Sequence, residues 1–175
     1  MRSTNPYACI QATLEVSRRV GWPANRLVFE ITETERVQDR QHLTSIIDAY
    51  RSMGFETALD DFGNGYANLD LLTDFTPNRL KIDREIVMGC DSDLRRQALL
   101  KSIITLSHEL DILLIAEGIE TEAEAVWLAR AGIMCQQGYF YAKPVINSLG
   151  EDLSSKLAAL RSKALARSTP EAVDA

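Results

Sequence analysis

Hydrophobic residues recur along this chain in two alternating patterns. One pattern places apolar side chains three or four positions apart, as on the buried face of a helix. The other gathers aliphatic and β-branched residues into short, nearly unbroken runs, as in the strands of a buried sheet. The helical spacing predicts helices over residues 6–20, 39–53, 69–72, 94–110, 121–131 and 153–160. The short runs predict strands over residues 27–33, 57–59, 79–83, 112–118 and 133–136.

Some of these elements carry sharper expectations. The run 27–33 is so apolar that we expect a strand buried on both faces. Thr121 and Glu124 have the spacing of a capping box, which should open the helix that follows them. In the helix 94–110, the face expected to be buried carries Leu99, Ile103, Leu106 and Leu110.

Strand and helix alternate along the whole chain, at a period of about thirty residues or less and with no long linker. This order is typical of βαβ units, whose strands lie parallel in one sheet. The sequence therefore predicts an α/β fold of about five βα units.

Every predicted strand has a polar or charged residue at or just beyond its C-terminal end. In chain order these residues are Glu30, Asp60 with Asp61, Lys81 with Asp83, Glu117, and Gln137. Ligands of α/β barrels and of open α/β sheets bind at this edge of the strands. We therefore expect the candidate site to be built from these residues.

The adjacent aspartates Asp60 and Asp61 end their strand in front of a glycine-containing loop. Neighbouring strand residues point to opposite faces, unless the backbone turns and lets both carboxylates converge. Two carboxylates that meet repel each other unless a cation lies between them. With Glu30 and Glu117 they form a set of hard oxygen ligands, which suits Mg²⁺ or Mn²⁺ better than Zn²⁺ or copper. A shared carboxylate permits a two-metal site that activates a water, with Lys81 orienting that water or balancing phosphate charge.

Each of these residues also has a plain structural interpretation. The aspartate pair and its glycines could be a helix N-cap followed by a turn. Lys81 could form a surface ion pair with Asp83 or Glu85. Glu117 and the glycine after it could be an ordinary turn.

Composition narrows the class of protein. The chain has 175 residues, of which 46% are hydrophobic and 25% charged, as in one soluble globular domain. Its net charge of -6 argues against DNA or RNA as a partner, but leaves room for a small phosphate ligand bound with metal ions. Cys9, Cys90 and Cys135 are too widely spaced for a zinc site or disulfide framework, and His42 and His108 fall in helical segments where we expect solvated side chains. No signal peptide or membrane-spanning run is apparent, so we expect a cytoplasmic protein.

Five motifs in series resemble those of the EAL-domain cyclic di-GMP phosphodiesterases, in order and with similar spacing. They are Phe29-Glu30-Ile31-Thr32-Glu33, Leu59-Asp60-Asp61-Phe62-Gly63-Asn64-Gly65-Tyr66, Leu80-Lys81-Ile82-Asp83, Ala116-Glu117-Gly118-Ile119-Glu120 and Gln137-Gly138-Tyr139. The resemblance covers about residues 9–144. It implies a TIM-like barrel and the metal-dependent hydrolysis of cyclic di-GMP to the linear dinucleotide pGpG.

The resemblance also implies a role for each matching residue. Glu30 and Asp60 resemble ligands of a first metal ion, and Asp60 with Asp61 resemble ligands of a second. Lys81 resembles the lysine beside the nucleophilic water, and Glu117 the glutamate described as base or as metal-site residue.

Four further residues are expected to support these. Asp83, Glu120 and Gln137 lie in the same motifs, and Gln137 resembles a partner placed behind the metal site. Glu33 resembles the glutamate that anchors the loop after the aspartate pair. In the family this loop couples the site to dimer formation, so a homodimer through residues 62–69 is expected.

The chain departs from the family pattern in two places. The family's Glu-Ala-Leu motif and a metal-binding asparagine belong upstream of the first helix here, and the sequence contains neither. In the loop, Asn64 stands where threonine or alanine is usual, and Ala67-Asn68 replace a pair of serines. We therefore expect an N-terminally truncated barrel over residues 1–150, its C-terminal helix over 151–167 and a disordered tail over 168–175.

The sequence thus predicts a cyclic di-GMP phosphodiesterase site that is inactive in this chain alone. The alternative is a catalytically inactive, EAL-derived regulatory or protein-interaction module. A phosphoacceptor receiver domain also combines aspartates, a lysine and Mg²⁺, but its aspartate pair should follow the first strand, which is not the order here.

Overall fold

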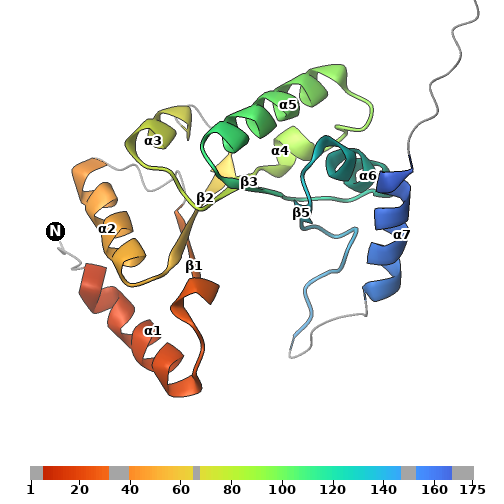
Figure 1. The fold of residues 1–175 in the computed structure, drawn as a ribbon. Helices are drawn as coiled ribbons and strands as arrows, with labels where there is room; N and C mark the ends of the chain where they lie inside the picture. The colour runs from red at the N-terminus through yellow and green to blue at the C-terminus, as the bar shows by residue number, and fades with distance from the viewer. Residues whose placement is uncertain (1–5, 32–39, 65–67, 147–152, 167–175) are drawn as a thin grey trace, which may run out of the picture. The chain divides into compact units, whose positions relative to one another are not determined.

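The computed structural model describes residues 6–31, 40–64, 68–146 and 153–166, and Figure 1 shows its helices and strands. The chain divides into two compact units. The first comprises residues 1–82 and 107–113, and the second residues 83–106 and 114–175.

The first unit contains a parallel sheet with helices before and between its strands. Its elements are α1 (Pro6–Val20), the 3₁₀ turn η1 (Ala24–Arg26), β1 (Val28–Ile31), α2 (Arg40–Ser52), β2 (Glu56–Phe62), α3 (Asn68–Asp74) and β3 (Arg79–Ile82). Strand β2 lies between β1 and β3, with Val28 opposite Glu56 and Ala58 opposite Arg79. The carboxyl ends of the three strands therefore lie at one edge of the sheet.

The core of this unit explains why these segments fold as they do. Leu43 and Ile47 from α2 are buried, as the helical spacing predicts, and Leu59 and Leu80 are buried in the central strands. The ring of Phe29 packs 4.5 Å from that of Tyr50 and 5.1 Å from that of Phe55. These contacts hold α2 against β1 and the start of β2.

The prediction of a strand buried on both faces is wrong for β1. Its residues 28–31 form the expected strand, but only Ile31 is buried, and the Glu30 side chain is 49% exposed. Within the described part of the first unit, β1 pairs with β2 alone. An edge strand of this kind keeps polar side chains in water, which the apolar character of the run did not indicate.

The second unit contains two parallel strands and most of the remaining helices. Its elements are α4 (Arg84–Val87), α5 (Leu94–Glu109), β4 (Leu113–Ala116), α6 (Glu122–Ala131), β5 (Cys135–Gln136) and α7 (Ser154–Leu165), with the end of α5 and the first residue of β4 counted in the first unit. Ile115 lies opposite Cys135, and Ala116 opposite Gln136. The capping box of Thr121 and Glu124 is present, and Gly132 ends α6 with a left-handed φ of 109°.

Three details of this unit differ from the predictions. On α5 Ile103 is buried as predicted, but its buried neighbours are Leu100 and Ser107, whereas Leu99 is 48% exposed and Leu106 and Leu110 are only partly buried. The short helix α4 was not predicted, and on α7 Leu160 is buried while Leu157 is 49% exposed. His108 is exposed, as expected. The His42 side chain and the tail 168–175 lie outside the described residues. No helix that the structure describes is long and apolar enough to cross a membrane.

Candidate functional site

The aspartate pair lies at the end of β2, where the strand departs from regular geometry. Asp61 has a left-handed φ of 54°, and the register between β2 and β3 shifts between Leu59 and Phe62. This turn interrupts the alternation of side chains, and carboxylate oxygens of Asp60 and Asp61 lie within 4.8 Å of each other. Both residues belong to the strand and precede α3 by several positions, so the helix N-cap interpretation is wrong.

Lys81 lies between two of the predicted metal ligands. Its Nζ is 2.7 Å from Oδ1 of Asp60 and 3.0 Å from Oε1 of Glu30. The residue is only 7% exposed, and β1, β2 and β3 each contribute one member of this group. A buried ammonium needs such partners, because its desolvation is costly otherwise.

Lys81 is therefore a buried partner of Asp60 and Glu30, and not a residue of the protein surface. Asp83 lies just beyond β3 and acts as the N-cap of α4, where its carboxylate accepts a 2.7 Å hydrogen bond from the backbone N–H of Glu85. Its role in the structure is to end the strand and start the helix.

In the second unit, Glu117 follows β4 directly and Gln137 follows β5 directly. The Gln137 side-chain amide donates a 2.5 Å hydrogen bond to Oε1 of Glu117. The backbone joins the same two segments, because Ile119 N–H donates to Gln137 O at 3.1 Å and Phe140 N–H donates to Ile119 O at 2.9 Å. Glu117 thus starts a turn, which is the structural interpretation given above, and its carboxylate is also bound by the Gln137 amide.

Two glycines allow the close packing of this turn. A Cβ at Gly138 would lie 2.2 Å from the backbone N and O of Ile119, and a Cβ at Gly118 would lie 2.5 Å from the Arg84 side chain. Arg84 also forms an ion pair with Glu120 at 2.9 Å, although both side chains are about half exposed and the pair stabilises little. The turn after β4 is therefore packed between the segment after β5 and the start of α4.

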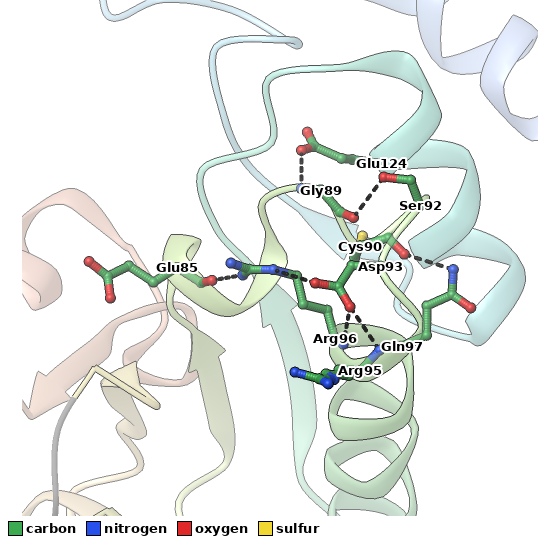
Figure 2. Close-up of polar contacts among 9 residues, drawn as sticks. All are labelled: Glu85, Gly89, Cys90, Ser92, Asp93, Arg95, Arg96, Gln97 and Glu124. Carbon is green, nitrogen blue, oxygen red and sulfur yellow. Dashed lines mark hydrogen bonds and ion pairs between the residues drawn. The ribbon is translucent and has the colours of Figure 1, made fainter.

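Sequence reasoning assigned Glu124 only to helix capping, but its contacts reach further. Its side chain is 3% exposed, and its carboxylate accepts hydrogen bonds from the backbone N–H groups of Thr121, Glu120 and Gly89. Figure 2 shows the bond to Gly89, which precedes the buried Cys90. Burial by itself raises the pKa of Glu124, but the three backbone hydrogen bonds outweigh it and hold the pKa below its usual value.

The structure thus brings together four predicted site residues in its first unit and two in its second. The first group is Glu30, Asp60, Asp61 and Lys81, and the second is Glu117 and Gln137. Glu120 follows Glu117 by three residues, but its side chain pairs with Arg84. Asp83 is a helix cap, and Glu33 lies outside the described residues, together with part of the loop 62–69.

Comparisons with known proteins agree with the motifs. The family model of the EAL domain matches residues 3–144. The probable cyclic di-GMP phosphodiesterase PdeN of Escherichia coli is 36% identical over 120 residues, which are 69% of this chain and 23% of that protein. The chain spans less than a third of the length of the curated relatives that it matches first.

Solved structures show the same fold. A standalone EAL protein from Vibrio cholerae, solved with cyclic di-GMP bound, is similar at a TM-score of 0.77 and 44% identity, over 80% of this chain and 59% of that one. Klebsiella pneumoniae BlrP1, solved in complexes of cyclic di-GMP with calcium or manganese, is similar at a TM-score of 0.75 and 33% identity, over 81% of this chain and 36% of that one. These likenesses confirm the predicted α/β class and the TIM-like barrel fold of which the chain represents a part.

Proposed function

Because the chain belongs to the EAL domain family, we propose that it supplies part of a site for the metal-dependent hydrolysis of cyclic di-GMP. The observation that carries this proposal is the convergence of Glu30, Asp60 and Lys81 at the carboxyl ends of three neighbouring strands, beside Asp61. Among the relatives, RocR of Pseudomonas aeruginosa is named a cyclic di-GMP phosphodiesterase and PdeN a probable one. Hydrolysis would give the linear dinucleotide pGpG.

The residues present fit a divalent metal ion. Glu30, Asp60 and Asp61 offer only carboxylate oxygens, the donors that Mg²⁺ and Mn²⁺ prefer. Lys81 uses one oxygen of Glu30 and one of Asp60, so each carboxylate keeps a second oxygen as a ligand. When bound, such an ion supplies an activated water and stabilises the leaving phosphate oxygen.

Each side chain has a proposed part in this reaction. Glu30 and Asp60 would hold a first metal ion, and Asp60 with Asp61 would hold a second. The Lys81 ammonium, already held by Asp60 and Glu30, orients the attacking water and offsets charge on a phosphate oxygen. Glu117 serves as base or metal-site residue, and its hydrogen bond from Gln137 fixes its carboxylate.

The ligand that we propose is a small nucleotide, not a nucleic-acid polymer. The net charge of -6 gives no basic face for a long run of phosphates, whereas bound metal ions can hold two phosphates. A cytoplasmic location and a homodimer through residues 62–69, which the resemblance to the family implies, are part of the same proposal.

A catalytically inactive regulatory module is the second candidate. It is favoured by the departures of the loop after the aspartate pair from the family pattern, where Asn64 stands in place of threonine or alanine and Ala67-Asn68 replace a pair of serines. Both candidates keep the cluster of Asp60 with Glu30 and Lys81, so metal binding does not distinguish them. Hydrolysis of cyclic di-GMP does, because only the enzyme would carry it out.

The metal site is tested by calorimetric titration of the 175-residue chain with Mn²⁺. We expect weak binding that is lost in Asp60→Ala and retained in Asp48→Ala, a matched control at an exposed aspartate of α2. Indistinguishable isotherms for the wild type and Asp60→Ala would refute the site.

A further inference from the structure

Glu124 is more than the partner of Thr121 in a capping box. A capping box needs one hydrogen bond from the glutamate back to the N-cap backbone, and here that donor is the N–H of Thr121 at 3.0 Å. The Glu124 carboxylate accepts two more backbone bonds, at 3.1 Å from Glu120 and at 2.8 Å from Gly89. Gly89 lies 35 residues earlier in the chain, so this last bond contributes nothing to the local start of α6.

The hydrogen bond from Gly89 links the segment after α4 to the start of α6. Gly89 follows α4, with a left-handed φ of 73°, and Glu120 belongs to the turn that begins at Glu117. The two carboxylate oxygens of Glu124 have different partners. Oε1 accepts from the N–H of Gly89, and Oε2 accepts from the N–H groups of Glu120 and Thr121. A buried carboxylate with three donors is costly to displace, so the two segments move together.

The same two segments meet at a second point. The Arg84 side chain fills the space in which a Cβ at Gly118 would lie, and its guanidinium pairs with Glu120. After Glu117, the Ile119 N–H donates to Gln137 O at 3.1 Å, and before it, Ala116 O accepts from the Gln137 N–H at 2.9 Å. The residues on both sides of Glu117 are thus fixed, and Glu124 is the buried, charged member of that support.

We propose that Glu124 is a positioning residue for Glu117, since its carboxylate fastens the turn that carries Glu117 to the segment after α4. The inference rests on the proposed function, because the role of Glu117 belongs to that proposal. Glu124 touches no reacting group, and its effect is transmitted through the backbone of residues 117–121.

The substitution Glu124→Gln separates positioning from capping. An amide has one acceptor oxygen in place of two, so it can keep the bonds to Glu120 and Thr121 or the bond to Gly89, but not both sets. The matched control is Thr121→Ala, which removes the hydroxyl that caps α6 at 3.2 Å and leaves all three bonds of the Glu124 carboxylate.

The experiment is a double-mutant cycle in the 175-residue chain, read by calorimetric Mn²⁺ titration. We expect Glu124→Gln to weaken Mn²⁺ binding about 10-fold, as loss of a residue that orients a metal ligand commonly does. We expect Glu117→Gln to weaken it similarly and the double variant to be no weaker than Glu117→Gln alone, because one residue acts through the other. Thr121→Ala should lower the melting temperature and keep Mn²⁺ affinity within twofold.

Two outcomes overturn the inference while the proposed function stands. One is an equal loss of affinity in Thr121→Ala and Glu124→Gln, and the other is a multiplicative loss in the double variant. If Glu117→Gln leaves Mn²⁺ affinity unchanged, Glu117 is not a metal-site residue, and backbone hydrogen exchange then decides the positioning. Faster exchange in both 84–90 and 117–121 on Glu124→Gln supports the link between the segments, and a change confined to 120–124 contradicts it.

Discussion

The surroundings of Lys81 are the strongest structural indication of a functional site at the strand ends. A lysine is rarely buried without a partner, and this one is 7% exposed with a carboxylate on either side. The arrangement lets carboxylates from β1 and β2 approach each other, because the ammonium between them offsets their repulsion.

Replacing Lys81 by methionine should therefore destabilise the fold as well as the site. The change leaves Asp60 and Glu30 without their shared cation, at a cost of about 1–3 kcal/mol, below the value for a fully buried pair because Glu30 is half exposed. Urea denaturation measures this difference, with Lys101→Met at an exposed position of α5 as the control. Equal midpoints for the two variants would contradict the proposed pairing.

Cys90 and Cys135 should differ in reactivity. Burial, followed by the charges of Glu124 and Asp91, raises the pKa of the Cys90 thiol to about 12. Cys135 is only partly buried, and the thiolate is the form that reacts. Timed alkylation of the native chain at pH 8, followed by peptide mass spectrometry, should label Cys135 at least tenfold faster than Cys90. Equal rates would mean that the segment around Cys90 opens readily.

Glu124 should make stability depend on pH in the acid range. Its pKa lies below the usual value in the folded chain, so the unfolded chain binds the proton more readily. The stabilisation is present above the unfolded pKa of about 4.3 and is lost as the pH falls through the folded pKa. Melting temperatures between pH 3 and 7 should fall less steeply in Glu124→Gln than in the wild type, and parallel curves would exclude this contribution.

At the scale of elements, the segment after β5 is held tightly against the turn after β4. Gly138→Ala would bring a Cβ to 2.2 Å from the Ile119 backbone, which must shift to accept it. The expected loss is about 1–3 kcal/mol, as for other overpacked sites, and thermal unfolding measures it. Gly21→Ala is the control, because Gly21 also has a positive φ, of 67° against 158° at Gly138, but open space around it. Equal losses would show that backbone conformation alone is responsible.

The order of the elements could be predicted, apart from the short η1 and α4, because the longer ones leave a local signal. The helix over residues 6–20 and the capping box at Thr121 were predicted from spacing alone and are present. The buried face of α5 could not be chosen, because leucines occupy both 99 and 100 and the helical period permits either. The burial of β1 depends on which strands lie beside it, and a single sequence does not contain that information.

The candidate site was predictable as a set of strand ends, but not in its contacts. The positions of Asp60, Lys81 and Glu117 follow from where apolar runs stop. The left-handed φ of Asp61 and the placement of Lys81 between two carboxylates depend on tertiary packing. Glu124 carried a capping signal, which explained one of its three backbone bonds and concealed the one to Gly89.

At the scale of the molecule, the first unit exposes an apolar groove of about 510 Å³ between α1 and the residues that follow it. Val16, Val20 and Trp22 line it and are 47%, 63% and 54% exposed. Exposed apolar patches of this kind promote association. We expect self-association in light scattering at tens of micromolar, reduced by Val20→Asp and unchanged by Leu165→Asp on α7. A monodisperse monomer would contradict association through this groove.

We expect no turnover of cyclic di-GMP by these 175 residues on their own. Loss of a single well-placed electrostatic contributor commonly lowers a rate by about 10²–10³. The family's Glu-Ala-Leu glutamate and upstream asparagine are both absent from the 175 residues, so turnover by these residues alone should be unmeasurable.

The most direct test is chromatographic detection of pGpG from cyclic di-GMP with Mn²⁺ present. The isolated chain should yield no product, and fusion to the missing N-terminal strands of an active EAL relative should restore hydrolysis. Restored activity should vanish with Lys81→Ala or Glu117→Ala in this chain. Robust product from the isolated chain would contradict the account, and a folded fusion without product would identify the chain as a regulatory module.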